Sequence, residues 1–303
     1  MHAFWMVWAA FLFASMGVCI KAAAPYFSPG EMVFYRGLIG MLLMFLWARR
    51  QGVSLTTKYP GMHAWRSLIG VTSLGAWFYA ISNLPLATAM TLNYMSSIWI
   101  AVFLVGAALW TWRPSAATPR PPLQGAIVAT IIVGFAGVVM LLRPNFNPSQ
   151  AFAGMLGLMS GMAAAFAYMQ VVALSRVGEP ETRTVFYFAT GSAIAGGLAT
   201  LVTGHSPWAG WHTLWLIPIG VLASIAQLAL TKAYAQAKTS RETLVVANLQ
   251  YSGIIFSAVF GMLYFGDVIP MLGWLGMLLI AGSGITATLL RARNAPDAPS
   301  EDR

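Results

Sequence analysis

The sequence predicts an all-α integral membrane protein with ten transmembrane helices in two inverted five-helix repeats, and with both termini in the cytoplasm. Three observations predict this class: the composition, a series of apolar runs along the whole chain, and the positions of Lys and Arg between them. The 303 residues are 58% hydrophobic and 8% charged, whereas a typical soluble domain is about 25% charged. A soluble fold could not hide this much apolar surface behind so few polar side chains.

Ten apolar runs follow one another along the chain, and each is long enough to cross a hydrocarbon core of about 30 Å. The first run has no basic segment before it and no convincing cleavage site, so it is interpreted as a retained span and not as a signal peptide. The narrowest division is Ser-Asn-Leu-Pro at 82–85, between the third and fourth runs. The expected spans are 3–23, 30–48, 64–82, 87–110, 122–142, 152–175, 183–203, 212–236, 241–264 and 270–290.

The positions of the basic residues set the expected orientation, because cytoplasmic loops are enriched in Lys and Arg. With both termini inside, all but three of the 17 Lys and Arg residues fall on the cytoplasmic side, Arg66 among them. The exceptions are Lys21, Arg36 and Arg143. The basic residues are spread over short loops, so the net charge of +9 indicates orientation in a bacterial-type inner membrane and not nucleic-acid binding.

The two halves of the chain resemble each other. Val-Phe-Tyr at 33–35 recurs at 185–187, and the stretch TLNYMSSIWIAVF (91–103) aligns with NLQYSGIIFSAVF (248–260). A repeat with an odd number of spans inserts its second copy upside down, and facing inverted repeats are a recurrent architecture of secondary transporters. The predicted division is 1–145 for the first repeat, 146–291 for the second, and 292–303 for a polar cytoplasmic tail.

On these residues the chain resembles the EamA family of ten-helix carriers, within the drug/metabolite transporter superfamily. The resemblance runs from LFASMGVCIKAAAPYFSPGEMVFYRG (12–37) through LPLATAMTLNYMSSIWIAVF (84–103) to FGDVIPMLGWLGMLLIAGSGI (265–285). It implies transport of small metabolites through a central cavity, formed largely by spans one, three, four, six, eight and nine. The family's Gly-Glu pair after span four is absent here, where the chain reads LWTWRPS (109–115).

Three ionisable residues near the ends of the first two spans have competing interpretations. Ser28 and Glu31 have the spacing of a capping box at the start of span two, although Glu31 could also contact substrate or a coupling ion. Arg36 lies inside span two, where an arginine is costly unless it faces protein or water. It is either a structural clamp on helix-end carbonyls or Glu31, or an anchor for an anionic or zwitterionic substrate. Lys21 either extends to the membrane surface or contacts substrate.

Polar and aromatic side chains inside the spans supply further binding candidates. Ser224, Gln227, Thr231 and Tyr234 share one helical face, which either packs against other helices or lines a wet cavity. Aromatic rings beside side-chain amides suit planar or amphipathic organic molecules. The candidate substrate-binding residues are Lys21, Arg36, Tyr79, Asn93, Tyr94, Tyr168, Gln227, Lys232, Gln250 and Tyr251.

These features predict a secondary transporter that moves a small amino-acid-like, aromatic, anionic or zwitterionic metabolite by alternating access. The alternatives are a flippase for a lipid-linked head group and, third, an intramembrane enzyme. All eight acids lie in loops, at span ends or in the tail, which does not support proton exchange through a buried carboxylate. Facilitated diffusion, exchange, and coupling through Lys, Tyr or Glu31 all remain open. No cofactor or metal site is expected, and the partners are the substrate and the lipid bilayer, with the protein a monomer or homodimer.

Overall fold

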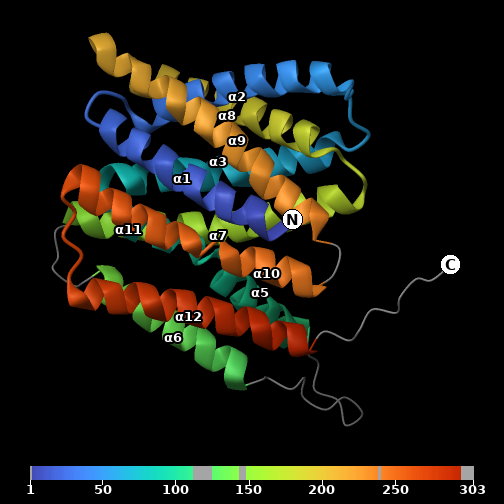
Figure 1. Cartoon of the computed structure of the whole chain (residues 1–303), viewed down its shortest axis with the longest axis vertical. Coiled ribbons are helices and arrows are strands. Elements are labelled where there is room, and N and C mark those ends of the chain that lie inside the picture. Colours follow the sequence, from blue (N-terminus) through green and yellow to red (C-terminus); the bar gives the residue numbers. More distant parts are fainter. Residues whose placement is uncertain (1, 112–124, 143–147, 238–239, 295–303) are drawn as a thin grey trace.

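The computed structural model describes every residue except 1, 112–124, 143–147, 238–239 and 295–303. Within the described residues the chain forms twelve α-helices and one 3-10 helix, which run side by side along the bundle (Figure 1). Arg113, Arg120, Arg143 and most of the predicted tail lie outside these residues. The elements are α1 (His2–Ala23), α2 (Pro29–Gln51), α3 (Pro60–Asn83), α4 (Leu86–Tyr94), α5 (Ser96–Thr111), α6 (Gly125–Leu142), α7 (Pro148–Arg176), α8 (Glu181–Thr203), η1 (Gly210–Trp215), α9 (Leu216–Gln236), α10 (Ser240–Leu249), α11 (Ser252–Phe265) and α12 (Met271–Asn294).

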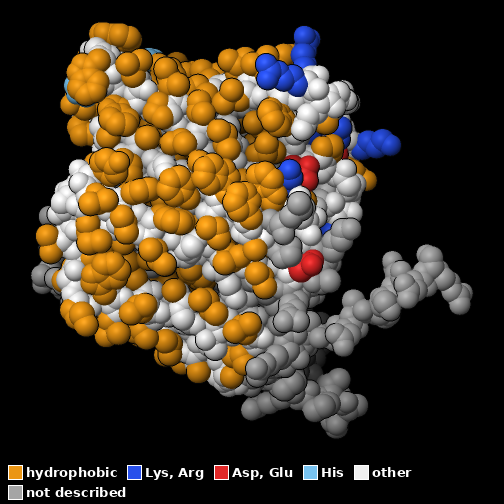
Figure 2. Space-filling view, in the orientation of Figure 1, with side chains coloured by type: hydrophobic (Ala, Val, Ile, Leu, Met, Phe, Trp, Pro, Cys, Tyr) orange, Lys and Arg blue, Asp and Glu red, His pale blue; other side chains and the backbone are white. Residues whose placement is uncertain are grey.

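The chain is an all-helical membrane protein, as its composition predicts. Seven segments of the described chain are long and apolar enough to cross a membrane, and the apolar helices Val128–Leu142 and Ser252–Phe265 are shorter. The face in Figure 2 is largely apolar, and Lys and Arg side chains gather at one end of it. α1 begins and α12 ends at that same end (Figure 1), which we call the terminal end of the bundle.

Two of the expected spans are each broken into two helices. The fourth consists of α4 and α5, and the ninth consists of α10 and α11. Around Met95 and Tyr251 the backbone forms i to i−3 hydrogen bonds, such as Met95 N–H to the Leu92 carbonyl at 3.3 Å and Tyr251 N–H to the Asn248 carbonyl at 3.1 Å. Such tightened turns inside a helix are frequent at hinges and functional sites. Both breaks fall within the two stretches that align with each other in the sequence.

The start of α2 contains the capping box expected from the Ser-Pro-Gly-Glu sequence at 28–31. The Ser28 hydroxyl accepts a hydrogen bond from the Glu31 N–H at 3.2 Å, and the Glu31 carboxylate accepts one from the Ser28 N–H at 2.9 Å. Glu31 also accepts hydrogen bonds from the backbone and hydroxyl of Ser206. The box therefore caps the start of α2, and its Glu31 carboxylate joins this helix to the segment between α8 and η1.

The closest helix packing depends on small residues. The most extensive contacts are between α2 and α8, α6 and α12, α1 and α9, and α3 and α7. A Cβ atom at Gly37 would lie 2.3 Å from the Ala193 nitrogen, and one at Gly196 would lie 2.4 Å from the Phe34 nitrogen. The backbones of α2 and α8 are thus in direct contact around Gly37 and Gly196.

Candidate functional site

A cavity of about 50 Å³ lies between helices from both halves of the chain. Five of the ten candidate binding residues line it: Arg36, Asn93, Tyr94, Tyr168 and Gln227. The rest of the lining comes mainly from α3, with two residues from α7 and single residues from α1 and α8. These further residues are Phe13, Arg66, Gly70, Ser73, Leu74, Trp77, Ala164, Ala167 and Phe188.

Two arginines dominate the electrostatics of this cavity. Arg36 on α2 is 4% exposed and Arg66 on α3 is 3% exposed. Their guanidinium carbons lie 5.1 and 4.2 Å from the centre of the Phe188 ring, within the range of cation–π contacts. Arg36 Nη1 also donates to the Ser192 hydroxyl at 3.3 Å. Neither arginine forms an ion pair with an acid in the described part of the chain.

Several donors on the cavity-lining residues are buried and lack an acceptor. They are Arg36 Nε, Arg66 Nε and Nη1, Trp77 Nε1 and the Tyr94 hydroxyl. A buried polar group without a partner is costly, and native structures contain few of them. Guanidinium groups bind carboxylate and phosphate through paired, charge-assisted hydrogen bonds. The cavity is therefore complementary to a ligand that is rich in acceptors and negatively charged.

The position of Arg66 follows from the start of α3. Pro60 occupies the first turn of this helix, as proline commonly does, so Arg66 lies inside the helix and not in a basic loop. Arg66, Gly70, Ser73 and Trp77 recur at helical spacing and all line the cavity. A Cβ at Gly70 would lie 2.0 Å from Arg66 Nη1, so this glycine leaves room for the guanidinium. The sequence analysis missed Arg66, although the argument applied to Arg36 would have identified it.

Amide and phenol groups also line the cavity. Asn93 Nδ2 donates to the Ser160 hydroxyl at 3.1 Å, which in turn donates to the Gly157 carbonyl. A Cβ at Gly161 would lie 2.5 Å from the Leu92 carbonyl oxygen, so α7 packs closely against the broken fourth span. Asn93 and Tyr94 consequently stand at the helix break, at the edge of the cavity.

The other five candidate residues do not line this cavity. Tyr79 packs edge-on against Phe152, and Gln250 Nε2 donates to the Ser96 hydroxyl at 3.3 Å. Lys232 Nζ lies 4.3 Å from the centre of the Trp5 ring. Tyr251 is buried in the core, and a Cβ at Gly284 would meet its hydroxyl. Their described contacts are thus between helices.

Lys21, the fifth of these, belongs to an ion pair at the end of the bundle opposite the terminal end. Its Nζ lies 2.8 Å from Asp267, in the connection between α11 and α12. Asp267 also accepts a hydrogen bond from the Leu86 N–H at 2.9 Å, at the start of α4. We call these three residues the Asp267 latch. It joins α1, α4 and the α11–α12 connection.

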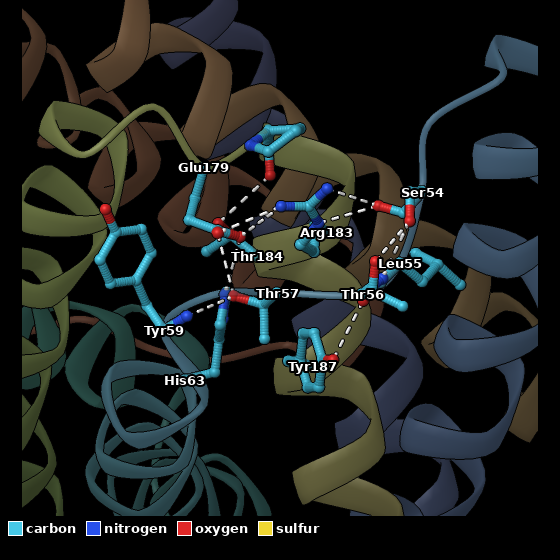
Figure 3. A network of polar contacts seen from close by, with 11 residues as sticks. Ser54, Leu55, Thr56, Thr57, Tyr59, His63, Glu179, Arg183, Thr184 and Tyr187 are labelled. Carbon is cyan, nitrogen blue, oxygen red and sulfur yellow. Dashed lines mark hydrogen bonds and ion pairs between the residues drawn. The ribbon is translucent and has the colours of Figure 1, made fainter.

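A second polar cluster, drawn in Figure 3, lies at the terminal end of the bundle, where the chain passes from α2 to α3 (Figure 1). Glu179, between α7 and α8, accepts hydrogen bonds from the Thr57 hydroxyl at 2.9 Å and from Arg183 at 3.1 Å, and its partner His63 lies at 3.0 Å. Arg183 also donates to the Ser54 carbonyl at 2.7 Å. This Glu179 cluster joins the α2–α3 loop of one half to the α7–α8 region of the other.

The Glu179 cluster predicts a pH dependence of stability. Burial raises the pKa of Glu179, but hydrogen bonds from His63, Thr57 and Arg183 outweigh burial, so its pKa lies below the ordinary value. A carboxyl with a depressed folded-state pKa stabilises the fold above the unfolded pKa, and this contribution is lost as the pH falls through the folded value. Between pH 7 and pH 3, the thermal midpoint of the wild type in detergent should fall more steeply than that of Glu179→Gln. Parallel curves for the two proteins would contradict this.

Comparison with known proteins gives the same family as the sequence motifs. The model of the EamA-like transporter family matches residues 1–109. The chain is 31% identical to the pseudopaline exporter of Pseudomonas aeruginosa (strain UCBPP-PA14), over 90% of this chain and 91% of that protein. It is 26% identical to a riboflavin transporter of Rhizobium johnstonii, over 96% and 91% of the two chains. One crystal structure superposes with a TM-score of 0.65 at 19% identity, covering 97% of this chain and 99% of the other.

Proposed function

Because the chain belongs to the EamA-like transporter family, we propose that it is a secondary carrier of a small anionic or zwitterionic organic metabolite, working by alternating access. Its relatives are transporters and not enzymes. The family thus accounts for transport of small metabolites, and the residues of the cavity support the finer assignment of the substrate.

The substrate class is inferred from Arg36 and Arg66, which both line the cavity and have no acidic partner in the described residues. An arginine at membrane depth costs several kcal/mol unless protein, water or a counter-charge compensates it. Two such arginines with free donors need a ligand that supplies acceptors and negative charge. The aromatic rings of Trp77, Tyr168 and Phe188 supply apolar walls, which favours a metabolite with a planar or apolar part beside its carboxylate.

Several features support two inverted repeats with both termini in the cytoplasm. The expected spans are numbered one to five in the first half and six to ten in the second, so span one corresponds to span six and span three to span eight. Spans one and eight pack against each other, and the corresponding pair, spans six and three, does so as well. Spans two and seven, and spans five and ten, pair with each other. The broken fourth and ninth spans also correspond. The concentration of Lys and Arg at the terminal end (Figure 2) is typical of a cytoplasmic face.

The size of the cavity supports a mechanism in which the ends open. Binding sites for small organic molecules usually have volumes of about 300–1,000 Å³, far above the 50 Å³ of this one. Binding therefore requires helices to separate. The Asp267 latch and the Glu179 cluster lie at opposite ends of the bundle, and we assign them as the contacts that open alternately.

The test is transport by the purified protein in liposomes. Efflux of candidate anionic and zwitterionic metabolites should saturate with substrate concentration, and protein-free liposomes should show none of it. Flux that rises linearly without saturation would indicate a channel. Movement of a fluorescent lipid between leaflets, without metabolite flux, would indicate the flippase alternative.

A further inference from the structure

We propose that this carrier is an obligatory exchanger, which reorients only when the Arg36–Arg66 cavity holds an anion and so moves one anion inward for each anion outward. The inference rests on the proposed function and specifies its coupling mode. It follows from the charge of the cavity and from the closure of both ends of the bundle, considered together.

The charge of the cavity has no internal compensation. Both guanidinium groups approach the same Phe188 ring, and no acid in the described residues lines the cavity. The acid closest to Arg36 along the chain, Glu31, is already engaged with the Ser206 segment, and Asp267 is engaged with Lys21. An anion from outside the chain is thus the available counter-charge.

The position of the two arginines makes their compensation necessary during reorientation. Arg36 is seven residues from the start of α2 and Arg66 six residues from the start of α3, so each lies about 10 Å along its helix from an end. When one end of the bundle is open, water can solvate the guanidinium groups. When both the Asp267 latch and the Glu179 cluster are closed, as described above, the Arg36 and Arg66 side chains are almost fully buried.

An alternating-access carrier must pass through that closed form in every half-cycle. An empty carrier would bury two positive charges and their free donors without a partner, which is strongly unfavourable. A loaded carrier exchanges water for charge-assisted hydrogen bonds to carboxylate, sulfonate or phosphate oxygens. A ligand shifts a conformational equilibrium only through its different affinity for the two forms, and here the closed form gains most from the anion. Reorientation of the carrier should therefore be fast when the cavity holds an anion and slow when the cavity is empty.

The test uses liposomes containing the full-length protein and loaded with a ¹³C-labelled small-molecule extract of bacterial cells. Outside is either the same extract without label or an osmotically matched sucrose buffer, with valinomycin and equal potassium on both sides. Mass spectrometry of the external medium measures labelled efflux. Efflux of at least one labelled anion should be at least tenfold faster into the unlabelled extract than into sucrose.

Two results would overturn the inference in different ways. Equal, saturable efflux into both media would leave the proposed transport function standing and refute exchange. Absence of protein-dependent efflux into either medium would refute the transport function together with the inference.

Variants test whether the arginines cause the dependence. In Arg66→Gln the cavity has one positive charge fewer, so the ratio of efflux into extract over efflux into sucrose should fall to less than threefold. Arg49→Gln, at an exposed position near the end of α2, is the matched control and should keep the wild-type ratio. An unchanged ratio in Arg66→Gln, at whatever absolute rate, would show that the arginine pair does not impose exchange.

Discussion

Replacing Arg36 or Arg66 with glutamine should lower the rate of substrate exchange about 100-fold. Each guanidinium offers two parallel donors to an anionic ligand, and hydrogen bonds to charged groups contribute about 1.5–3 kcal/mol each. The loss of two such bonds corresponds to a factor of 100 or more in binding. Initial rates of exchange in liposomes, at substrate concentrations below saturation, measure the effect.

Two comparisons separate recognition from folding in this prediction. Arg36→Lys keeps the positive charge but loses the planar fork of donors, so it should fall between the wild type and Arg36→Gln. Elution of each variant as a single symmetric peak in detergent verifies that it folds. Wild-type exchange by folded Arg36→Gln and Arg66→Gln would remove the anion site from the mechanism.

The different treatment of the two arginines in the sequence analysis has a physical reason. Arg36 stood out because its neighbours on both sides are apolar and helical, so its depth was evident. Arg66 follows closely after Lys58 and the apparent loop that starts at Gly52, so it was counted with the basic residues on the cytoplasmic side. The start of α3 at Pro60 is what shows that Arg66, like Arg36, lies inside a helix. Orientation statistics assign a charge to one side of a membrane but do not measure its depth.

Long-range pairing limited the prediction of the rest of the site. Lys21 and Asp267 are 246 positions apart, and nothing in either local sequence indicates that they meet. The Glu179 cluster joins residues more than 100 positions apart for the same reason. In contrast, the capping box of α2 depends on residues three apart, and local sequence was sufficient to predict it.

The helical character of the spans was predictable because it depends on composition and length, both of which are local. The breaks inside the fourth and ninth spans were not predicted, since no proline marks them. The break in the fourth span lies where carbonyl groups of that span meet the backbone of α7 at Gly161, which is a tertiary contact. The two aligned stretches nevertheless indicated that these regions correspond in the two halves.

Substituting Gly37 with alanine should lower the thermal midpoint of the protein by at least 5 °C. The added Cβ would lie 2.3 Å from the Ala193 nitrogen and 2.7 Å from its Cα, and backbone atoms cannot rotate away as a flexible side chain can. Overpacking typically costs about 1–3 kcal/mol and sometimes more, so α2 and α8 must separate. Gly75→Ala on α3 is the matched control, because nothing lies within 4 Å of its added Cβ.

The same substitution should also impair transport more than its effect on stability alone explains. Gly37 is adjacent to Arg36, and the contacts of that guanidinium, Ser192 and Phe188, are both on α8. Separation of the two helices withdraws Arg36 from the cavity wall, and a misplacement of about 1 Å in a positioned group is costly to function. Measured well below its lowered midpoint, Gly37→Ala should show at least a tenfold slower exchange rate, whereas Gly75→Ala should match the wild type. If Gly37→Ala is destabilised but exchanges substrate at the wild-type rate, the close contact of α2 with α8 is not what positions Arg36 for transport.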